Sequence, residues 1–158
     1  MIRLESMTDD EYRAAMPESV AEYAVGQVRT GNWIKEGSLE RAQRVFEKLL
    51  PEGVDTPGHH VLSIVDAGTS ASVGLLWYME RDDRTLPSVF ICELRVFEPY
   101  RRKGFATAAM TELEEYVRRE HGARRILLHT FAHNRAARTL YERLGYGMTN
   151  VTMAKNVV

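Results

Sequence analysis

Three consecutive cations followed by a glycine form the most informative chemical pattern in the sequence. Arg101, Arg102 and Lys103 precede Gly104, and the residues that follow resemble the first turn of a helix. The first amides of a helix lack partners within the helix, and the helix dipole adds about half a positive charge there. Such amides can bind a phosphate, and a glycine lets ligand atoms approach the backbone closely. We therefore expect residues 101–107 to bind an anionic group.

The same segment differs from two other phosphate-binding loops. No Gly-Lys-Ser/Thr is present, which excludes a P-loop, and the early glycine of a dinucleotide-binding G-x-G pattern is missing. A basic run before a helix is also typical of solvated surface. The segment by itself leaves the anion site and the solvated surface as alternatives.

A second group of candidates lies on one face of a later predicted helix. Asn134 is a good N-cap, and Tyr141 follows seven residues later, almost two helical turns, with Ala137 between them. The small alanine keeps that face shallow, so the tyrosine hydroxyl can lie near a bound ligand. A plain amphipathic helix with a capping asparagine and a core tyrosine is the alternative.

Glu93 is a candidate because a carboxylate is unexpected in an apolar strand. Phe90, Ile91 and Cys92 precede it, and a buried carboxylate is costly unless it has a partner or a role. Burial would raise its pKa towards a value useful for a general base. The alternatives are that Glu93 pairs with a structural arginine or points to solvent. Cys92 is expected to be a small buried residue.

Hydrophobic periodicity indicates the elements that must position these residues. Helices are predicted over 8–30, 38–50, 104–120 and 134–144. Pro17 is expected to divide the first helix, and Ser38 is expected to cap the second. Strands are predicted over 60–66, 73–79, 88–97, 125–131 and 146–153. This order predicts an α/β fold with a mixed sheet and helices on both faces.

Composition limits the class of protein. The 158 residues suit one domain spanning 1–158, and 44% hydrophobic with 27% charged residues is ordinary for a soluble globular protein. The 21 basic and 22 acidic residues give a net charge of −1, which argues against nucleic-acid binding through bulk electrostatics. No apolar run reaches the ~18 residues that span a bilayer, and the N-terminus lacks the plan of a signal peptide.

The cysteine and histidine content indicates neither a disulfide nor a metal centre. The single cysteine excludes an intramolecular disulfide and a cysteine-based zinc site, and it suits a reducing, cytoplasmic compartment. His59 and His60 are adjacent, so their side chains project differently, and no carboxylate motif accompanies them. We interpret them as loop or pocket-wall residues and expect no metal.

Taken together, the two helix-associated patterns resemble the GNAT superfamily of N-acetyltransferases. The coenzyme A signature of that family, Gln/Arg-x-x-Gly-x-Gly/Ala, is matched by Arg101, Gly104 and Ala106. The residues that match its second signature are Asn134, Ala137, Leu140-Tyr141 and Gly145-Tyr146. The interval between the two patterns accommodates one helix and one strand. The resemblance is tight from about residue 88 to residue 146, and it fits the element order of the whole chain.

The resemblance implies a GNAT fold with acetyl-CoA as co-substrate. The sheet would be mostly antiparallel, and the strand that ends at Val96 would be splayed from its parallel neighbour. Leu94, Arg95 and Val96 would lie along the pantetheine arm, and Asn134 would contact it. Amides of the loop and the following helix would hold the pyrophosphate. The residues expected to bind the coenzyme there are Arg101, Arg102, Lys103, Gly104, Phe105, Ala106 and Thr107.

The resemblance also implies direct attack of a primary amine on the acetyl group. Tyr141 would lie near the thioester sulfur as general acid, and Glu93 is our candidate general base. No motif identifies the acceptor, a small molecule or an amino group of a peptide or protein. Candidates to line its cleft are Tyr23, Trp33, Trp77, Tyr78 and Glu80, and a place in the core or at the rim is the alternative for most of them.

Two questions stay open on sequence alone. A non-catalytic acyl-CoA-binding or sensor module is the alternative function, and it would keep residues 101–107 but not need Glu93 or Tyr141. Dimers are common in the family, so a homodimer is possible, but nothing in residues 147–158 decides the oligomeric state.

Overall fold

A computed structural model describes residues 1–82 and 85–158. Its regular elements in chain order are β1 (Ile2–Ser6), α1 (Asp9–Arg29), α2 (Ser38–Leu49), η1 (Gly53–Asp55), β2 (His59–Asp66), β3 (Ser72–Arg81), β4 (Ser88–Val96), η2 (Glu98–Tyr100), α3 (Phe105–His121), β5 (Arg125–Leu128) and α4 (Arg135–Arg143). The strands of this described part form one sheet in the order β1-β2-β3-β4-β5. All neighbours are antiparallel except the parallel pair β4–β5, which confirms the predicted mixed sheet.

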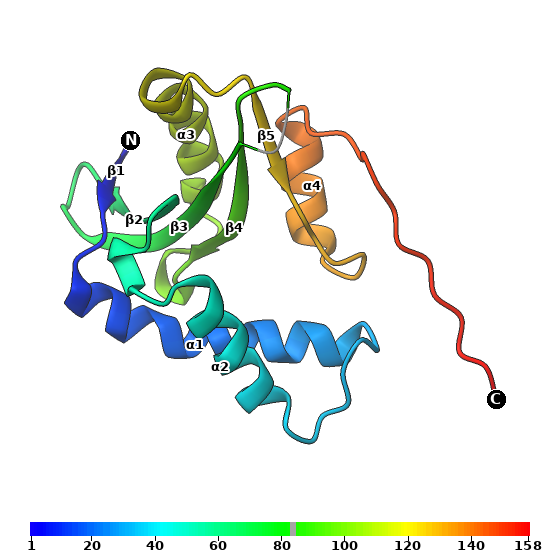
Figure 1. The fold of residues 1–158 in the computed structure, drawn as a ribbon. Coiled ribbons are helices and arrows are strands. Elements are labelled where there is room, and N and C mark those ends of the chain that lie inside the picture. The colour runs from blue at the N-terminus through cyan, green and yellow to red at the C-terminus, as the bar shows by residue number, and fades with distance from the viewer. Residues whose placement is uncertain (83–84) are drawn as a thin grey trace.

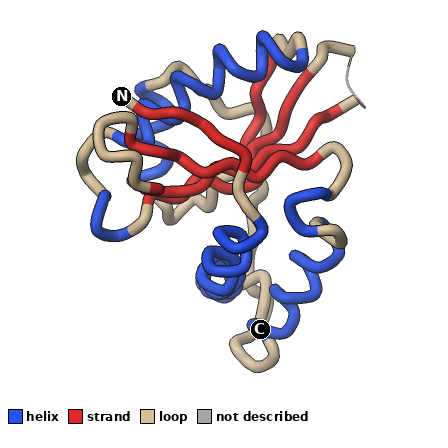
Figure 2. The backbone as a smooth tube through the Cα atoms, turned by 90° about the vertical axis from the view of Figure 1, so that its left-hand side faces the viewer, coloured by secondary structure: helices blue, strands red, loops and turns tan. Residues whose placement is uncertain are grey.

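Helices cover both faces of the sheet (Figures 1 and 2). Met110 and Leu113 of α3 are fully buried in one cluster with Leu76 of β3. The next residue of that strand, Trp77, belongs to a second cluster with Met16 of α1 on the opposite face. Successive strand residues point to opposite faces, so β3 supplies both cores. None of the helices in the described ranges is long and apolar enough to cross a bilayer.

α1 begins where the sequence predicts but does not break where expected. Thr8 and Glu11 form a capping box, in which each side chain accepts a hydrogen bond from the other residue's amide. The helix then continues through Pro17 to Arg29, so the predicted division is wrong. A proline inside a helix loses one hydrogen bond. The buried contacts of Met16 and Val20 on either side of it offset that loss.

Two further local predictions are corrected at the N-terminal half. The cap of α2 is Gly37 with a left-handed φ of 73° and no side-chain bond, so Ser38 is the first helical residue and not the cap. β1, which pairs antiparallel with β2 at the edge of the sheet, was not predicted from the sequence. Residues of β1 are mostly exposed, so the strand carries little of the hydrophobic alternation that identifies the others.

The predicted last strand over 146–153 does not form. Residues 147–158 leave the body as an extended, exposed segment that Figure 1 shows in orange and red. A strand requires a partner for its backbone groups. In the described chain β5 pairs with β4 alone, so its other edge stays unpaired while Met148, Val151 and Met153 are exposed.

β4 and β5 separate half-way along β4, as the resemblance implies. Ser88–Ile91 pairs with Arg125–Leu128, but β4 continues to Val96 with β3 as its only strand partner among the described residues. β5 ends at Leu128 and not at the predicted residue 131. The register between β3 and β4 also shifts at Trp77/Tyr78, opposite Cys92. The second half of β4 therefore has an open edge.

Candidate active site

The open edge of β4 presents backbone groups that have no neighbouring strand. The amide of Phe97, directly after β4, donates to Val73 of β3 at 2.8 Å. Alternate residues of an antiparallel strand direct their hydrogen bonds to opposite sides, so the groups of Leu94 and Val96 face away from β3. The Val96 carbonyl accepts a hydrogen bond from Arg101 Nε at 2.9 Å. This geometry fits an extended ligand such as a pantetheine arm.

The start of α3 offers amides to solvent at the end of that edge. Gly104 is the N-cap with φ 85°, a left-handed conformation that favours glycine, and no side chain caps the helix. No group in the described part of the chain accepts a hydrogen bond from the amides of Phe105, Ala106 or Thr107. A Cβ built on Gly104 would meet nothing within 4 Å. The helix start is therefore open, as an anion site requires.

The three cations before Gly104 lie in the loop that leads into α3. Arg101 bonds the end of β4, and Lys103 Nζ lies 5.9 Å from the centroid of the Tyr100 ring. Arg102 is exposed and has a positive φ of 62°, which is strained for a residue with a side chain. Such strain persists only where the surrounding structure enforces it. The loop between η2 and α3 thus has a conformation that the surrounding structure enforces, and it carries three positive charges.

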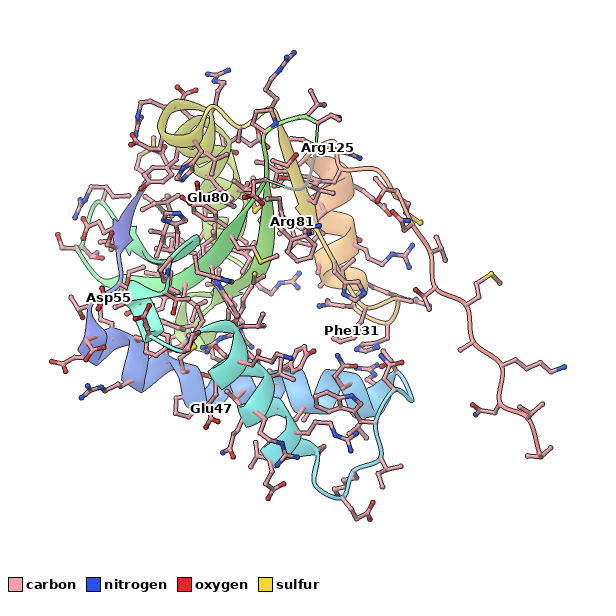
Figure 3. The ribbon with its side chains drawn as sticks, in the orientation of Figure 1. Glu47, Asp55, Glu80, Arg81, Arg125 and Phe131 are labelled. Atoms are coloured by element: carbon pink, nitrogen blue, oxygen red, sulfur yellow. The ribbon has the colours of Figure 1, made fainter. Side chains whose placement is uncertain are left out.

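A cleft of about 680 Å³ lies where β4 and β5 separate. Four residues expected from the sequence to act in binding or catalysis line it: Glu93, Leu94, Asn134 and Tyr141. The cleft is bounded by α1, α2, the second half of β4 and the segment from Leu128 to Tyr141. Figure 3 labels Phe131 in that segment, facing α1. Phe131 packs so closely on α1 that a Cβ at Gly26 would lie 2.6 Å from its ring.

Tyr141 faces the cleft with a protonated and unpaired hydroxyl. Its ring packs edge-on against Tyr146, with 5.7 Å between the ring centroids. Burial raises the pKa of the Tyr141 hydroxyl, which keeps the proton on it at neutral pH. No described residue hydrogen-bonds this hydroxyl, so it is available to a ligand. Asn134 caps α4 as predicted, because its side chain accepts from the Ala137 amide at 3.2 Å.

Glu93 is both largely buried, as expected of a candidate general base, and paired with an arginine, which was the alternative from the sequence. Its Oε1 accepts a hydrogen bond from Arg95 Nε at 3.1 Å, while its buried Oε2 has no partner in the described structure. Burial raises the pKa of the carboxyl, although Ser19 and Arg95 act in the opposite direction. Arg95 itself is 5% exposed and also bonds Glu18 and the Ala15 carbonyl of α1. The Arg95 side chain is thus committed to α1. Its backbone groups face β3, as the alternation from Phe97 requires, so neither part of Arg95 is directed at the open edge.

The loop between β5 and α4 contributes residues that the sequence analysis missed. His133 stacks on Phe131 with ring centroids 5.3 Å apart, and His129 meets the same ring edge-on at 5.5 Å. Both histidines line the cleft, as does Glu22 of α1. Aromatic rings occur at every second position from residue 129 to 133, and this pattern could have indicated a cleft wall. It was instead interpreted as part of the strand predicted over 125–131.

The predicted acceptor lining is correct only in part. Tyr23 and Trp77 line the cleft. Trp33 packs edge-on against Tyr23 at 5.6 Å and does not line it. Tyr78 and Glu80 are on the α3 face, where both contact His121, so they take the core and rim places that were the alternative for them. The register shift opposite Cys92 and the alternation along β3 separate these side chains from the cleft.

Comparison with known proteins agrees with this architecture. Residues 20–146 match the acetyltransferase (GNAT) family. The chain belongs to this family. YycN of Bacillus subtilis, named an uncharacterized N-acetyltransferase, is 36% identical over 156 residues and covers 99% of each chain. YdgE of the same organism, with the same kind of name, is 34% identical over 154 residues, 98% of this chain and 97% of its own.

Solved structures extend the agreement to three dimensions. The crystal structure of Bacillus subtilis YycN has a TM-score of 0.93 at 35% identity, and the match covers 100% of this chain and 99% of YycN. A protein from Pyrococcus furiosus has a TM-score of 0.69 at 21% identity over 99% of this chain and 100% of its own, which shows a shared fold. This GNAT protein is therefore a transferase of the acetyltransferase type.

Proposed function

We propose that this GNAT protein transfers an acetyl group from acetyl-CoA to a primary amine within a ternary complex. The observation that carries the proposal is the continuity of three features. The open edge at Leu94 and Val96 leads at one end to the free amides of α3. At the other end it borders the cleft that Glu93 and Tyr141 share. A coenzyme with its pyrophosphate at α3 and its arm along β4 would direct its thioester towards Tyr141.

Residues of the cleft can accept and donate the protons that this reaction transfers. The neutral amine attacks the thioester carbonyl, a C–N bond forms, and Glu93 accepts the proton that the nitrogen loses. The C–S bond then breaks, and Tyr141 donates a proton to the leaving thiolate. The products are the N-acetylated amine and coenzyme A, and solvent restores both side chains. General acid and base groups typically contribute about 10²–10⁴-fold each to the rate.

Direct attack is favoured over an acetylated enzyme intermediate. Cys92 is next to Glu93, but burial raises the pKa of its thiol to about 12. A thiol at that pKa is almost wholly protonated at neutral pH and is a poor nucleophile. The acetyl group therefore passes from the coenzyme to the amine in one transfer.

The cleft suits an acceptor that carries positive charge before it reacts. Glu22 and Glu93 line it, and its aromatic members include Tyr23 and Phe131. Carboxylates and aromatic faces both attract ammonium groups. Acceptors of this kind include small amines and exposed amino groups of peptides or proteins.

Two measurements on the purified protein test the proposal. Calorimetry with acetyl-CoA should give binding with an affinity in the micromolar range, and a panel of amino acids, polyamines, aminoglycosides and peptides should release coenzyme A thiol with at least one acceptor. Absence of binding at high acetyl-CoA concentration would contradict the proposal. Binding without thiol release for any acceptor would favour the non-catalytic acyl-CoA module.

We propose that acetyl transfer in this single domain of 158 residues needs no metal and takes place in the cytoplasm. The acid and base roles fall to Tyr141 and Glu93, so no step requires a Lewis acid. The compartment is supported by the one cysteine of the sequence, which lies half-buried as a free thiol. Nucleic acid and membrane are not expected partners.

We further propose a homodimer in which the C-terminal segment pairs with a second copy. The segment from Met148 carries exposed apolar side chains, and a groove of about 670 Å³ lies along the free edge of β5. An unpaired edge strand is a template for another chain. Light scattering of the full chain should give a dimer, and removal of residues 148–158 should give a monomer. A full chain that is monomeric at high concentration would contradict this.

A further inference from the structure

A second group of reactive side chains lies on the face of the sheet opposite the cleft. His60 of β2, Glu80 of β3 and His121 at the end of α3 each offer one ligand atom, and these three atoms lie within 4.8 Å of one another. Figure 3 labels Glu80 beside α3, away from Phe131 and the cleft. No step of the proposed acetyl transfer uses these residues.

The distances within the group are close to those of a metal site. His60 Nε2 lies 2.9 Å from Glu80 Oε2, and His121 Nδ1 lies 3.6 Å from Glu80 Oε1. Tetrahedral Zn²⁺ with bonds of about 2.0–2.1 Å holds its ligand atoms about 3.4 Å apart. The two distances, which run to the two different oxygens of Glu80, lie on either side of that value, and one ligand atom from each residue lies within 4.8 Å of the others. Small side-chain movements are enough to place a cation among the three atoms.

Tyr78 holds both histidines in the required orientation. Its hydroxyl lies 2.8 Å from His121 Nε2, so His121 directs Nδ1 towards Glu80. The His60 ring stacks on the Tyr78 ring, with 4.7 Å between centroids and 17° between planes. Tyr78 is fully buried, and its position is therefore fixed by the core. Metal-binding histidines characteristically have the second ring nitrogen hydrogen-bonded, as His121 Nε2 is here, whereas His60 is oriented by ring stacking.

The group is also accessible and has suitable charge. The exposed fractions of the side chains are 18% for His121, 30% for His60 and 46% for Glu80. A cation can therefore enter from solvent, and water can complete its coordination. Two neutral imidazoles and one carboxylate suit a borderline divalent cation such as Zn²⁺ or Co²⁺.

We propose that His60, Glu80 and His121 bind a divalent cation of the Zn²⁺ type. The bound ion connects β2, β3 and the C-terminal end of α3, and it acts on stability at a distance from the acetyl-transfer cleft. A ligand that binds only the folded state raises the thermal midpoint.

The test uses the full chain without an affinity tag. Calorimetry with ZnCl₂ should give stoichiometric binding, and Zn²⁺ should raise the thermal unfolding midpoint. Co²⁺ should give the intense visible absorption of a tetrahedral complex. His60→Gln and His121→Gln should each weaken binding by at least about tenfold and abolish the thermal shift. The matched control is the double variant His129→Gln/His133→Gln in the cleft, which should bind Zn²⁺ as the wild type does.

Each other outcome overturns the proposal. Wild-type protein that takes up none of these cations has no such site. Uptake that is unchanged in both His60→Gln and His121→Gln is non-specific, and loss of uptake in the His129/His133 double variant places the ion in the cleft. Binding is read directly, so the result does not depend on whether acetyl transfer is observed. Both ligand histidines are partly exposed, so these variants are expected to fold.

Discussion

The two halves of β4 differ in what lies along their second edge. Ser88–Ile91 has β3 on one side and β5 on the other, and Val89 there is fully buried. In the described part of the chain, the half from Cys92 to Val96 pairs with β3 alone, and its side chains are mostly half-buried. In a strand with two partners, the backbone donors and acceptors on both sides are paired within the sheet. A strand with one partner keeps donors and acceptors for a ligand.

The difference teaches that one part of a strand can stabilise the sheet while another part stays available for a ligand. The first half anchors the sheet, so the second half can leave an edge open at little cost. If this division is right, substitutions near the open half should alter binding or turnover while the protein stays folded. Substitutions in the closed half should alter stability while turnover per folded molecule stays constant.

The largest expected effect is that of Tyr141→Phe, at a residue of α4 that lines the cleft beside the open half of β4. Loss of the proton donor should lower kcat about 100-fold, while the affinity for acetyl-CoA stays nearly constant. The measurement is steady-state kinetics combined with calorimetry. Tyr116→Phe on α3 is the matched control and should retain full turnover. Equal turnover in both variants would remove Tyr141 from the mechanism.

Glu93→Gln should lower turnover by a similar factor and change its pH dependence. The raised pKa of Glu93 means that the carboxyl stays protonated, and cannot act as base, to a higher pH than an exposed glutamate. The ratio of wild-type to Glu93→Gln kcat/KM, measured with one amine, should therefore fall as the pH is lowered. The ionisation of the amine cancels in this ratio. A ratio that is constant with pH would assign the base to another group.

Val89→Ala tests the closed half. It should lower the free energy of unfolding by about 2 kcal/mol, because a fully buried valine loses two methyl groups of apolar contact. Denaturant unfolding measures this, and kcat well below the thermal midpoint should be unchanged. Ile34→Ala, at a side chain that is 69% exposed, should cost under about 0.5 kcal/mol. A large loss of kcat in Val89→Ala would break the division between the halves.

The smallest effect is expected at the start of α3. Gly104→Ala should raise the dissociation constant of acetyl-CoA about tenfold, because one or two amide contacts with the pyrophosphate are lost. Gly122→Ala, at the other end of the same helix, carries the same left-handed strain with φ 61° and equally open space. It should lose similar stability but bind the coenzyme normally. Equal affinities in the two variants would show that α3 does not hold the pyrophosphate.

Most elements that position the site could be predicted from the sequence, because their signals are local. The capping box at Thr8, the cap at Asn134 and the helix start at Gly104 each depend on a few consecutive residues. The errors arose where tertiary contacts override local preference. Packing around Pro17 keeps α1 intact, and the segment after Gly145 has strand composition but no strand partner among the described residues.

The sequence named candidate residues for the site but not how they are arranged in space. Glu93 and Tyr141 were identified by type and spacing, whereas the bond between Glu93 and the buried Arg95, and its anchoring on α1, required the packed structure. The same holds for the cluster on the α3 face. His60 was dismissed as a ligand because no carboxylate accompanies it in sequence, yet Glu80 and His121 lie beside it in space.

The sequence by itself determined where most of the helices and the inner strands lie, which side chains are candidates to act, and the family to which they point. Hydrogen-bonded caps, glycine conformations and hydrophobic periods are fixed by neighbouring residues, so they can be read directly. Only the tertiary structure decided where β4 and β5 separate and which residues share a cleft or a possible metal site. Contacts such as that of Tyr78 with His121, 43 residues apart, depend on how the whole chain closes on its core.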